Sequence, residues 1–488
     1  MKYISTRNGS VETNGASAVI DGIAADGGLF VPTELPKLDY REFYGLDYVK
    51  RADKVLRAFF DFDVDGVAAA AYGTFDTDDP APVVKLDDNM FVLELWHGST
   101  HAFKDMALSV LPRLLSRAKR AENKNDKTLI LVATSGDTGK AALEGFKNVE
   151  GTEVCVFYPT DGVSRVQKLA MQTQDGDNVR AVGITGNFDD AQTAVKAAFR
   201  DERLKRALAA DNITMSSANS INVGRLVPQI AYYFSAYADL VDSGEIKSGD
   251  KIDFVVPTGN FGNILAGWYA LRMGLPVNKL VCASNRNNVL TDFIDTGVYD
   301  VNREFFKTSS PSMDILVSSN LERLIFETSG RNAELTAARM RELKDGGRYS
   351  VTPDEIEAIR AVFAGDYADD KDAEQAIADM FDEYGYLIDT HTASAYAAAV
   401  KREFVRPTVI VSTADPYKFA PAVLRALGED ADGEATLDTL KRLEELTAME
   451  IPDSLAQVFT AEVRFTDTVE PDRIADYISD VYCKDSDK

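Results

Sequence analysis

The sequence contains few of the residues from which disulfide frameworks and metal centres are built. Its 488 residues include only three cysteines and three histidines, and the cysteines are far apart and form no CxxC pair. An odd number of isolated cysteines favours reduced thiols in a cytoplasm over a disulfide-linked secreted fold. His97 and His101 have the i,i+4 spacing of a helical zinc pair, but a turn containing Gly98 separates them and HExxH is absent. We therefore expect no metal site and interpret His391 either as structural or as a residue that supports the groups lining a site.

Long apolar runs are also absent, and basic residues are outnumbered by acidic ones. No apolar run approaches the roughly 18 residues of a membrane span. Residues 1–7 carry no export signal, so we expect a cytoplasmic chain without a membrane partner. The 53 lysines and arginines face 78 aspartates and glutamates, which gives a formal net charge of −25. This charge argues against nucleic acid as a partner, and it requires that any anionic ligand be held by local features.

What remains is the composition of an ordinary globular protein. Hydrophobic residues make up 45% of the chain, which is enough for a large core, and the length favours two or three domains. From about residue 85 onward, short apolar stretches alternate with helical patterns. This alternation predicts an α/β fold with mostly parallel sheets covered by helices. The strand candidates are residues 90–95, 128–133, 154–158, 252–256, 280–283 and 408–411.

Three units are expected along the chain. Residues 1–84 form the first unit and end in a polar linker rich in aspartate and proline. Residues 85–420 form an α/β core, in which the segment at about 310–400 is largely helical and charged. Residues 421–488 alternate helix-like and strand-like stretches and form a C-terminal extension. Inside the core, Pro112 should kink or restart the helical pattern in which it lies.

One lysine lies between a predicted strand and a predicted helix. The strand is residues 90–95, a turn follows at residues 98–100, and a helical pattern begins near Phe103, so Lys104 lies close to a helix N-terminus. Partial burial and the positive end of a helix both lower the pKa of a lysine. An uncharged lysine amine can form a Schiff base with a carbonyl. The alternative is a solvated lysine, which is the common case.

A second turn joins the strand at residues 128–133 to a helix. Small and hydroxyl residues occupy it, from Ser135 to Gly139. Backbone N–H groups at such a helix start suit a carboxylate or a phosphate. The spacing is not that of a P-loop, because the second glycine comes too early. On the pattern alone, an N-capping turn is an equal alternative.

Three further polar stretches lie beside predicted strands or helices, and two of them, residues 257–263 and 216–225, are candidates for anion binding. Residues 257–263 contain two glycines and two asparagines between a buried strand and a helix, an arrangement that favours a phosphate cradle. Residues 412–419 follow the last predicted strand. Residues 216–225 cluster hydrogen-bond donors and end in Arg225, a residue type well suited to a phosphate. An ordinary polar helix start is the alternative for that last stretch.

Together these stretches resemble the threonine synthase family, which belongs to the fold type II enzymes that use pyridoxal 5′-phosphate (PLP). Residues 99–105, Ser-Thr-His-Ala-Phe-Lys-Asp, are similar to the family's PLP-lysine segment, although the family usually has proline and leucine at the positions of Ser99 and His101. Residues 412–419 are similar to the family's Ser-Thr-Ala-His-Pro-x-Lys-Phe, with Asp415 in place of histidine. The N-terminal residues also resemble a segment that other fold type II enzymes lack.

The resemblance implies a fold, a reaction and a set of site residues. The implied fold is a fold type II core with an N-terminal threonine-synthase domain. The implied reaction converts O-phospho-L-homoserine and water to L-threonine and phosphate by PLP-dependent β,γ-elimination and hydration. Lys104 is implied as the catalytic residue and covalent anchor of PLP. The implied cofactor-binding residues are Lys104, Asp137, Gly259, Asn260, Phe261, Gly262, Asn263 and Thr413. The implied substrate-binding residues are Ser135, Gly136, Thr138, Gly139, Asn219, Ser220, Asn222 and Arg225.

Two other functions remain as alternatives. A serine or threonine dehydratase shares the fold type, but the N-terminal segment argues against it. A non-enzymatic phosphate-binding protein, or a degenerate homologue, is disfavoured by the presence of Lys104. Residues 310–320 also resemble the family but receive no chemical role from the sequence. The oligomeric state stays open.

Overall fold

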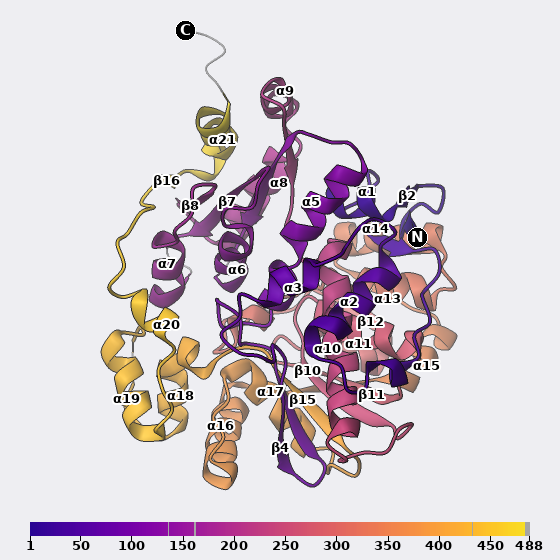
Figure 1. Ribbon diagram of the computed structural model, residues 1–488, viewed down its shortest axis with the longest axis vertical. Coiled ribbons are helices and arrows are strands. Elements are labelled where there is room, and N and C mark those ends of the chain that lie inside the picture. The colour runs from indigo at the N-terminus through magenta and orange to yellow at the C-terminus, as the bar shows by residue number, and fades with distance from the viewer. Residues whose placement is uncertain (135, 161–162, 432, 484–488) are drawn as a thin grey trace.

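The structure, a computed structural model, describes residues 1–134, 136–160, 163–431 and 433–483, without the side chains of residues 188 and 189. Two sheets dominate it (Figure 1), one in the upper half of the view and one in the lower half. The larger is six-stranded, in the order β14-β11-β10-β15-β5-β4. All neighbouring strands in it are parallel except the edge pair of β4 and β5. Its strands are β4 (Val83–Asp87), β5 (Met90–Glu94), β10 (Ile252–Pro257), β11 (Val277–Ser284), β14 (Phe363–Tyr367) and β15 (Thr408–Ser412).

The second large sheet is five-stranded and entirely parallel. Its order is β16-β8-β7-β6-β9. The strands are β6 (Lys127–Ala133), β7 (Thr152–Pro159), β8 (Val179–Ile184), β9 (Ile213–Ser216) and β16 (Thr468–Val469). Two small antiparallel sheets complete the set. They consist of β1 (Lys2–Ser5), β2 (Glu12–Asn14) and β3 (Phe30–Pro32), and of β12 (Val298–Asp300) with β13 (Arg348–Ser350).

Helices cover both large sheets, as the alternating pattern predicts. The longest described helix, α10 (Val223–Asp242), is buried on nearly every side and packs against α2, α11 and α4. A helix that is apolar all round is stable only inside a core, and α10 occupies the centre of the molecule. The other helices are α1 (Gly15–Asp21), α2 (Tyr48–Phe59), α3 (Val67–Tyr72), α4 (Asp105–Leu108), α5 (Leu111–Ala121), α6 (Asp137–Phe146), α7 (Arg165–Gln172), α8 (Phe188–Ala198), α9 (Glu202–Ala210), α11 (Gly262–Met273), α12 (Val289–Thr296), α13 (Leu321–Thr328), α14 (Ala333–Gly346), α15 (Pro353–Val362), α16 (Asp370–Tyr384), α17 (Thr390–Val400), α18 (Ala420–Ala426), α19 (Leu437–Thr447), α20 (Asp453–Gln457) and α21 (Ile474–Tyr482).

The predicted α/β class is confirmed, and each strand candidate lies in an observed strand. Pro112 restarts the helical pattern as expected, because α4 ends at Leu108 and α5 begins at Leu111. The prediction of a largely helical segment at about 310–400 missed β14, which forms the edge of the six-stranded sheet. Its sequence, Phe-Ala-Gly-Asp-Tyr, is too short and polar to be distinguished from a loop.

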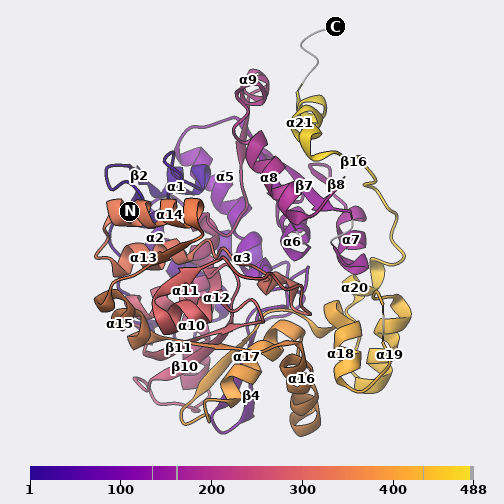
Figure 2. The same ribbon diagram turned by 180° about the vertical axis from the view of Figure 1, so that it is seen from behind.

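The C-terminal residues contact the five-stranded sheet although they are far from it in sequence. After α20 the chain runs along the outside of the molecule (Figure 2), where β16 pairs with β8 and α21 packs against α9. No helix in the described ranges is both long enough and apolar enough to cross a membrane.

Candidate active site

The turns singled out in the sequence meet between the two large sheets. They follow the carboxyl ends of β5 and β15 in one sheet and of β6 in the other, and parallel sheets bind ligands at such ends. Ala102, after β5, forms an antiparallel bridge with Ala414, after β15. The Nζ atom of Lys104 lies 3.5 Å from a carboxylate oxygen of Asp137, after β6. The site therefore contains groups contributed by both sheets.

Lys104 has the surroundings that a reactive amine requires. It is buried immediately before α4, and its Nζ atom donates a hydrogen bond to Ser312 Oγ at 3.3 Å. Burial lowers the pKa of Lys104; the charge of Asp137 opposes this shift, while the cations of Lys418 and Arg225 add to it. The predicted position between a strand and a helix is confirmed, and the alternative of a solvated lysine is wrong.

Asp137 is the first residue of α6 and is held by cations on two sides. Lys418 Nζ lies 2.9 Å from Oδ1, and the Gln167 side chain donates to the same oxygen at 3.0 Å. Burial raises the pKa of Asp137, but Lys418 and Lys104 lower it by more, so the carboxylate stays ionised. A buried carboxylate is thus stabilised as an anion beside the reactive amine.

Lys418 is a site residue that the sequence analysis did not identify. It is buried in the short 3₁₀ helix η3 (Pro416–Phe419), where its Nζ atom donates to the Thr100 carbonyl at 2.8 Å. Together with its contact to Asp137, this bond ties the turn after β5 to the turn after β6. The lysine lies in the quoted stretch 412–419, so the only available signal was its membership of that motif.

Asp415, the residue that departs from the family pattern, lies opposite His101. Its carboxylate accepts from the Tyr417 N–H at 2.8 Å and so caps η3. Its own N–H donates to the His101 carbonyl at 3.1 Å. Burial raises the pKa of Asp415 to about 6, and burial with the charge of Lys418 lowers the pKa of His101 to about 3. His101 is therefore a neutral imidazole at physiological pH.

The glycine-rich turn between β10 and α11 is shaped by close packing. A Cβ atom at Gly259 would lie 2.7 Å from the Ser312 carbonyl oxygen, whereas one at Gly262 would be at ordinary contact distance. Phe261 adopts a φ of +61°, which a bulky residue rarely does and which is typical of functional sites. Asn260 is exposed, and its carbonyl accepts from the Asn320 side chain at 3.0 Å.

Asn263 presents a buried donor that no described residue satisfies. Its Oδ1 accepts from Tyr232 at 2.6 Å and from Tyr233 at 2.8 Å, which fixes the amide so that its Nδ2 group stays unpaired. The Nε–H of Arg225 is also buried without a partner in the described chain. A buried donor without a hydrogen-bond partner lowers the stability of the fold, so it calls for an explanation. Two of them, each on a residue in the first turn of a helix, fit an anionic group such as a phosphate.

Arg225 lies in the first turn of α10 and is the strongest candidate among the predicted substrate contacts. It is buried, and burial lowers its pKa to about 10, so it remains charged at neutral pH. Asn222 has both amide atoms engaged, because it caps α10 through Gly224 N–H and donates to the Val19 carbonyl. Its observed role is to hold the helix that carries Arg225. Asn219 is exposed and Ser220 half-buried.

The turn before α6 is tightly built. Gly136 has a φ of +148°, and a Cβ atom there would collide with the Gln167 side chain. The N–H groups of Gly136 and Gly139 both donate to Thr134 Oγ1 at 3.0 Å, so this hydroxyl, which the sequence analysis overlooked, shapes the turn. Thr138 is half-buried. Ser135 lies outside the described residues.

Thr413 is fixed between two neighbouring segments. Its carbonyl accepts from the Phe103 N–H at 2.9 Å, and its N–H donates to Thr392 Oγ1 at 3.3 Å. The threonine is thereby held one residue away from the bridge that joins the turn after β5 to the turn after β15.

Two residues near Lys104 received no chemical role from the sequence. Ser312 belongs to the short 3₁₀ helix η2 (Pro311–Met313), in the stretch whose function was left unassigned. Its N–H donates to His391 Nε2 at 3.2 Å, and His391 Nδ1 lies 2.6 Å from Asp389 Oδ2. His391 is buried, and of the two readings given for it, the contact with Ser312 favours a residue that supports a neighbour of Lys104.

The two remaining histidines have different partners. His97 stacks on Trp96 and contacts Glu94 at 2.6 Å, while His101 contacts Ser454 of α20. Among the described residues, no cluster of three or more histidine, cysteine, aspartate or glutamate side chains could hold a metal.

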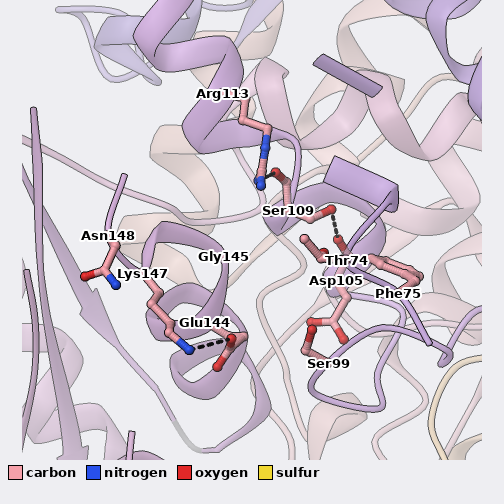
Figure 3. Close-up of a pocket in the computed structure, with 10 residues that line it drawn as sticks. All are labelled: Thr74, Phe75, Ser99, Asp105, Ser109, Arg113, Glu144, Gly145, Lys147 and Asn148. Carbon is pink, nitrogen blue, oxygen red and sulfur yellow. Dashed lines mark hydrogen bonds and ion pairs between the residues drawn. The ribbon is translucent and has the colours of Figure 1, made fainter. Parts of the chain in front are cut away.

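A cavity of about 240 Å³ is lined by residues of α4, α5 and α6 and of the loops beside them (Figure 3). Arg113 of α5 points into it from one side, and Asp105, the neighbour of Lys104, faces it from another. Its lining does not include Lys104 or any residue of the turns after β10 and β15. This cavity is therefore separate from the place where the predicted site residues meet.

Comparison with protein families gives matches along nearly the whole chain. Residues 79–414 match the family described as pyridoxal-phosphate dependent enzyme. Residues 2–70 match threonine synthase N terminus, and residues 392–478 match threonine synthase, C-terminal.

Individual relatives carry related names. Threonine synthase-like 1 of Homo sapiens is 41% identical over 431 residues, which cover 84% of this chain and 58% of that relative. The chain thus spans less than two thirds of the length of the human protein. Threonine synthase of Pseudomonas aeruginosa is 39% identical, and the match covers 94% of this chain and 97% of that protein.

Solved structures of similar proteins superpose over almost the full length. PLP-bound threonine synthase from Brucella melitensis has a TM-score of 0.87 at 35% identity, covering 98% of this chain and 99% of that one. Threonine synthase from yeast has a TM-score of 0.88 at 30% identity, covering 99% of this chain and 98% of that one.

Proposed function

The chain belongs to the threonine synthase family of pyridoxal-phosphate dependent enzymes, and we propose that it converts O-phospho-L-homoserine and water to L-threonine and phosphate. The observation that carries this proposal is the buried amine of Lys104, whose pKa burial lowers, at the junction of two parallel sheets. The N-terminal match supports this member of the wider PLP family, because the family that it matches is described as threonine synthase N terminus.

The residues present fit the cofactor. We assign Lys104 as the covalent anchor of the PLP aldehyde, through a Schiff base, and the turn from Gly259 to Asn263 as the cradle of its phosphate. The unpaired Nδ2 group of Asn263 supports that assignment. Thr413 is assigned to the ring nitrogen and Asp137 to the ring hydroxyl. When bound, PLP supplies an electron-accepting ring that stabilises negative charge on the substrate.

Residues of the chain carry out proton transfer and substrate binding. Lys104, once free of the cofactor, takes the proton from the substrate's α carbon, and the ionised Asp137 stabilises the resulting ammonium. We assign Arg225 to the substrate phosphate, because its Nε–H is unpaired and its charge survives burial. The turn from Gly136 to Gly139 is assigned to the substrate carboxylate, and Asn219 and Ser220 stay candidates for contacts to the substrate.

Substrate turnover tests this function directly. The purified protein is expected to show the visible absorbance of a lysine-bound PLP and to release phosphate and L-threonine from O-phospho-L-homoserine. Release of a 2-oxoacid and ammonia from serine or threonine at a comparable rate would instead identify a dehydratase. A protein that binds PLP and turns over none of these compounds would refute both functions.

The compartment is part of the proposal. We assign the enzyme to the cytoplasm, supported by three cysteines that are all free, two of them buried.

A further inference from the structure

Ser312 is held beside Lys104 by two independent sets of contacts. On one side its loop is fixed through Asp314, whose carboxylate accepts from the side chains of Asn285 and Asn287 at 2.8 and 3.0 Å. On the other side, its N–H donates to His391. Ser312 Oγ and Lys104 are 208 positions apart in the chain, so no local structure holds them together. Their contact depends instead on the bonds of Asp314 and on the bond to His391.

The contact with His391 fixes the tautomer of that ring. A backbone N–H can only donate, so Nε2 of His391 is the acceptor and Nδ1 carries the proton that faces Asp389. Asp389 is fully buried and also accepts from the N–H groups of His391 and Thr392, as the cap of α17. The chain from Asp389 through His391 to Ser312 is therefore rigid.

A neutral lysine amine has two N–H donors and one lone pair. At Lys104, the acceptors that contact Nζ among the described residues are the carboxylate of Asp137, at 3.5 Å, and the hydroxyl of Ser312, at 3.3 Å. If both donors are engaged, the lone pair points in a third direction and cannot rotate freely. A base with a fixed lone pair reacts faster than one that samples many orientations.

We propose that Ser312 is a further catalytic residue, whose hydroxyl accepts a hydrogen bond from the Lys104 amine and stabilises it as it becomes an ammonium, and that Asp389 and His391 position this hydroxyl. In the step concerned, the C–H bond at the substrate's α carbon breaks, the proton passes to Nζ of Lys104, and the electron pair stays with the substrate. The hydrogen bond strengthens as charge develops, which lowers the barrier. This role rests on the proposed function, since it assumes that Lys104 is the base.

The first test measures Lys104 without any turnover. The rate at which the apo protein captures PLP, followed by absorbance across pH, reports the pKa of Lys104 in its surroundings of Asp137, Lys418 and Arg225. Ser312→Ala is expected to lower that pKa, because a bond that favours the charged form is lost. Ser312→Thr, which keeps the hydroxyl, should restore it. Ser309→Ala, in the same loop but bonded to Asp370, is the control and should leave it unchanged.

The second test measures the reaction. Ser312→Ala should lower kcat about 10- to 100-fold with little change in KM, the range expected for a charge-assisted hydrogen bond. His391→Ala should also lower kcat. The double variant should have a kcat only slightly lower than that of Ser312→Ala, because both changes act on the same contact, the one between Ser312 Oγ and Lys104.

The outcomes separate this role from the proposed function. The role of Ser312 would be overturned if the Ser312→Ala protein behaved as the wild type in three respects. It would retain PLP, capture PLP with the wild-type pH profile and transfer the α proton at the wild-type rate. A wild-type protein that makes no threonine would overturn the function, while the capture experiment would still measure the contact between Ser312 and Lys104. If Ser312→Ala fails to fold, a wild-type pKa in Ser312→Cys, which replaces the hydroxyl by a weaker acceptor, would overturn the role.

Discussion

The amine of Lys104 lies 3.5 Å from the carboxylate of Asp137, although the two residues follow strands of different sheets. Each residue alone would be held in one protonation state: a buried lysine without a partner stays neutral, and a buried carboxylate without a cation takes up a proton. The second cation on Asp137, Lys418, keeps the carboxylate ionised while Lys104 changes its charge. The pair therefore depends on the packing of one sheet against the other.

Replacing Lys104 with alanine is expected to abolish covalent cofactor binding. Borohydride treatment of the wild-type holoenzyme should label one peptide, the one that contains Lys104, and the variant should stay unlabelled. Lys418 is the informative competitor, because it is also buried and lies beside the same carboxylate. Finding the label on Lys418 in the wild-type protein would refute the assignment.

Gly259 and Gly262 are expected to respond differently to substitution. A side chain at Gly259 meets the Ser312 backbone at 2.7 Å, so Gly259→Ala should displace the turn and weaken PLP binding about 10-fold or more. Gly262→Ala places its methyl group 3.4 Å from the Asn320 side chain, which the protein tolerates, so this variant is the matched control for packing. A larger side chain at Gly262 should still weaken PLP binding by keeping the phosphate from the backbone. Titration of the apo proteins with PLP measures all three; equal affinities would contradict a phosphate cradle at this turn.

Arg225 is expected to affect the substrate more than the cofactor. Arg225→Ala should lower kcat/KM for O-phospho-L-homoserine about 100-fold or more and leave PLP occupancy nearly unchanged, because a charge-assisted contact to the reacting phosphate is lost. Wild-type discrimination against homoserine and serine should reach about 10⁴-fold, because these compounds leave the buried donors unpaired. Arg113→Ala is the control, because Arg113 lines the separate cavity of Figure 3, and this variant should preserve that selectivity. Normal kinetics in Arg225→Ala would remove this arginine from the site.

Asp415 should make the protein less stable as pH rises. Burial raises its pKa to about 6 from a usual value of 3.8, so between these values the folded protein holds a proton that the unfolded chain has lost. The contribution of Asp415 to the free energy of unfolding is fully present below about pH 4 and is lost as pH rises through 6. The free energy of unfolding falls by up to about 3 kcal/mol over that range.

Asp415→Asn removes the ionisation and keeps an acceptor for the Tyr417 N–H. Its free energy of unfolding should exceed that of the wild type at pH 8, and the difference should shrink at pH 4.5. Denaturant unfolding at both pH values measures it. Asp438→Asn, an exposed position on α19, should show no such pH-dependent gain. A gain of equal size at both pH values would contradict the ionisation argument.

The sequence by itself determined the strands that lead into the site and the turns that follow them. Apolar runs such as residues 128–133 and 252–256 have the length and boundaries of buried strands, and these signals are local. The position of Lys104 between a strand and a helix follows from the same local reading. The cofactor and the proposed reaction came from motif resemblance, which is also local, because each motif lies within a single turn.

Only the tertiary structure decided which side chains meet. Lys418 reaches the site because β15 lies beside β5 in the sheet, and Ser312 reaches it because His391 and Asp314 hold its loop there; no periodic pattern in the sequence encodes these neighbours. The structure also assigned the amide of Asn222 to capping and left Asn263 and Arg225 with unpaired donors, since hydrogen-bond partners depend on neighbours far away in sequence. Local interactions determine which segments become helices and strands. Burial of apolar faces between sheets and helices determines which of these helices and strands pack together.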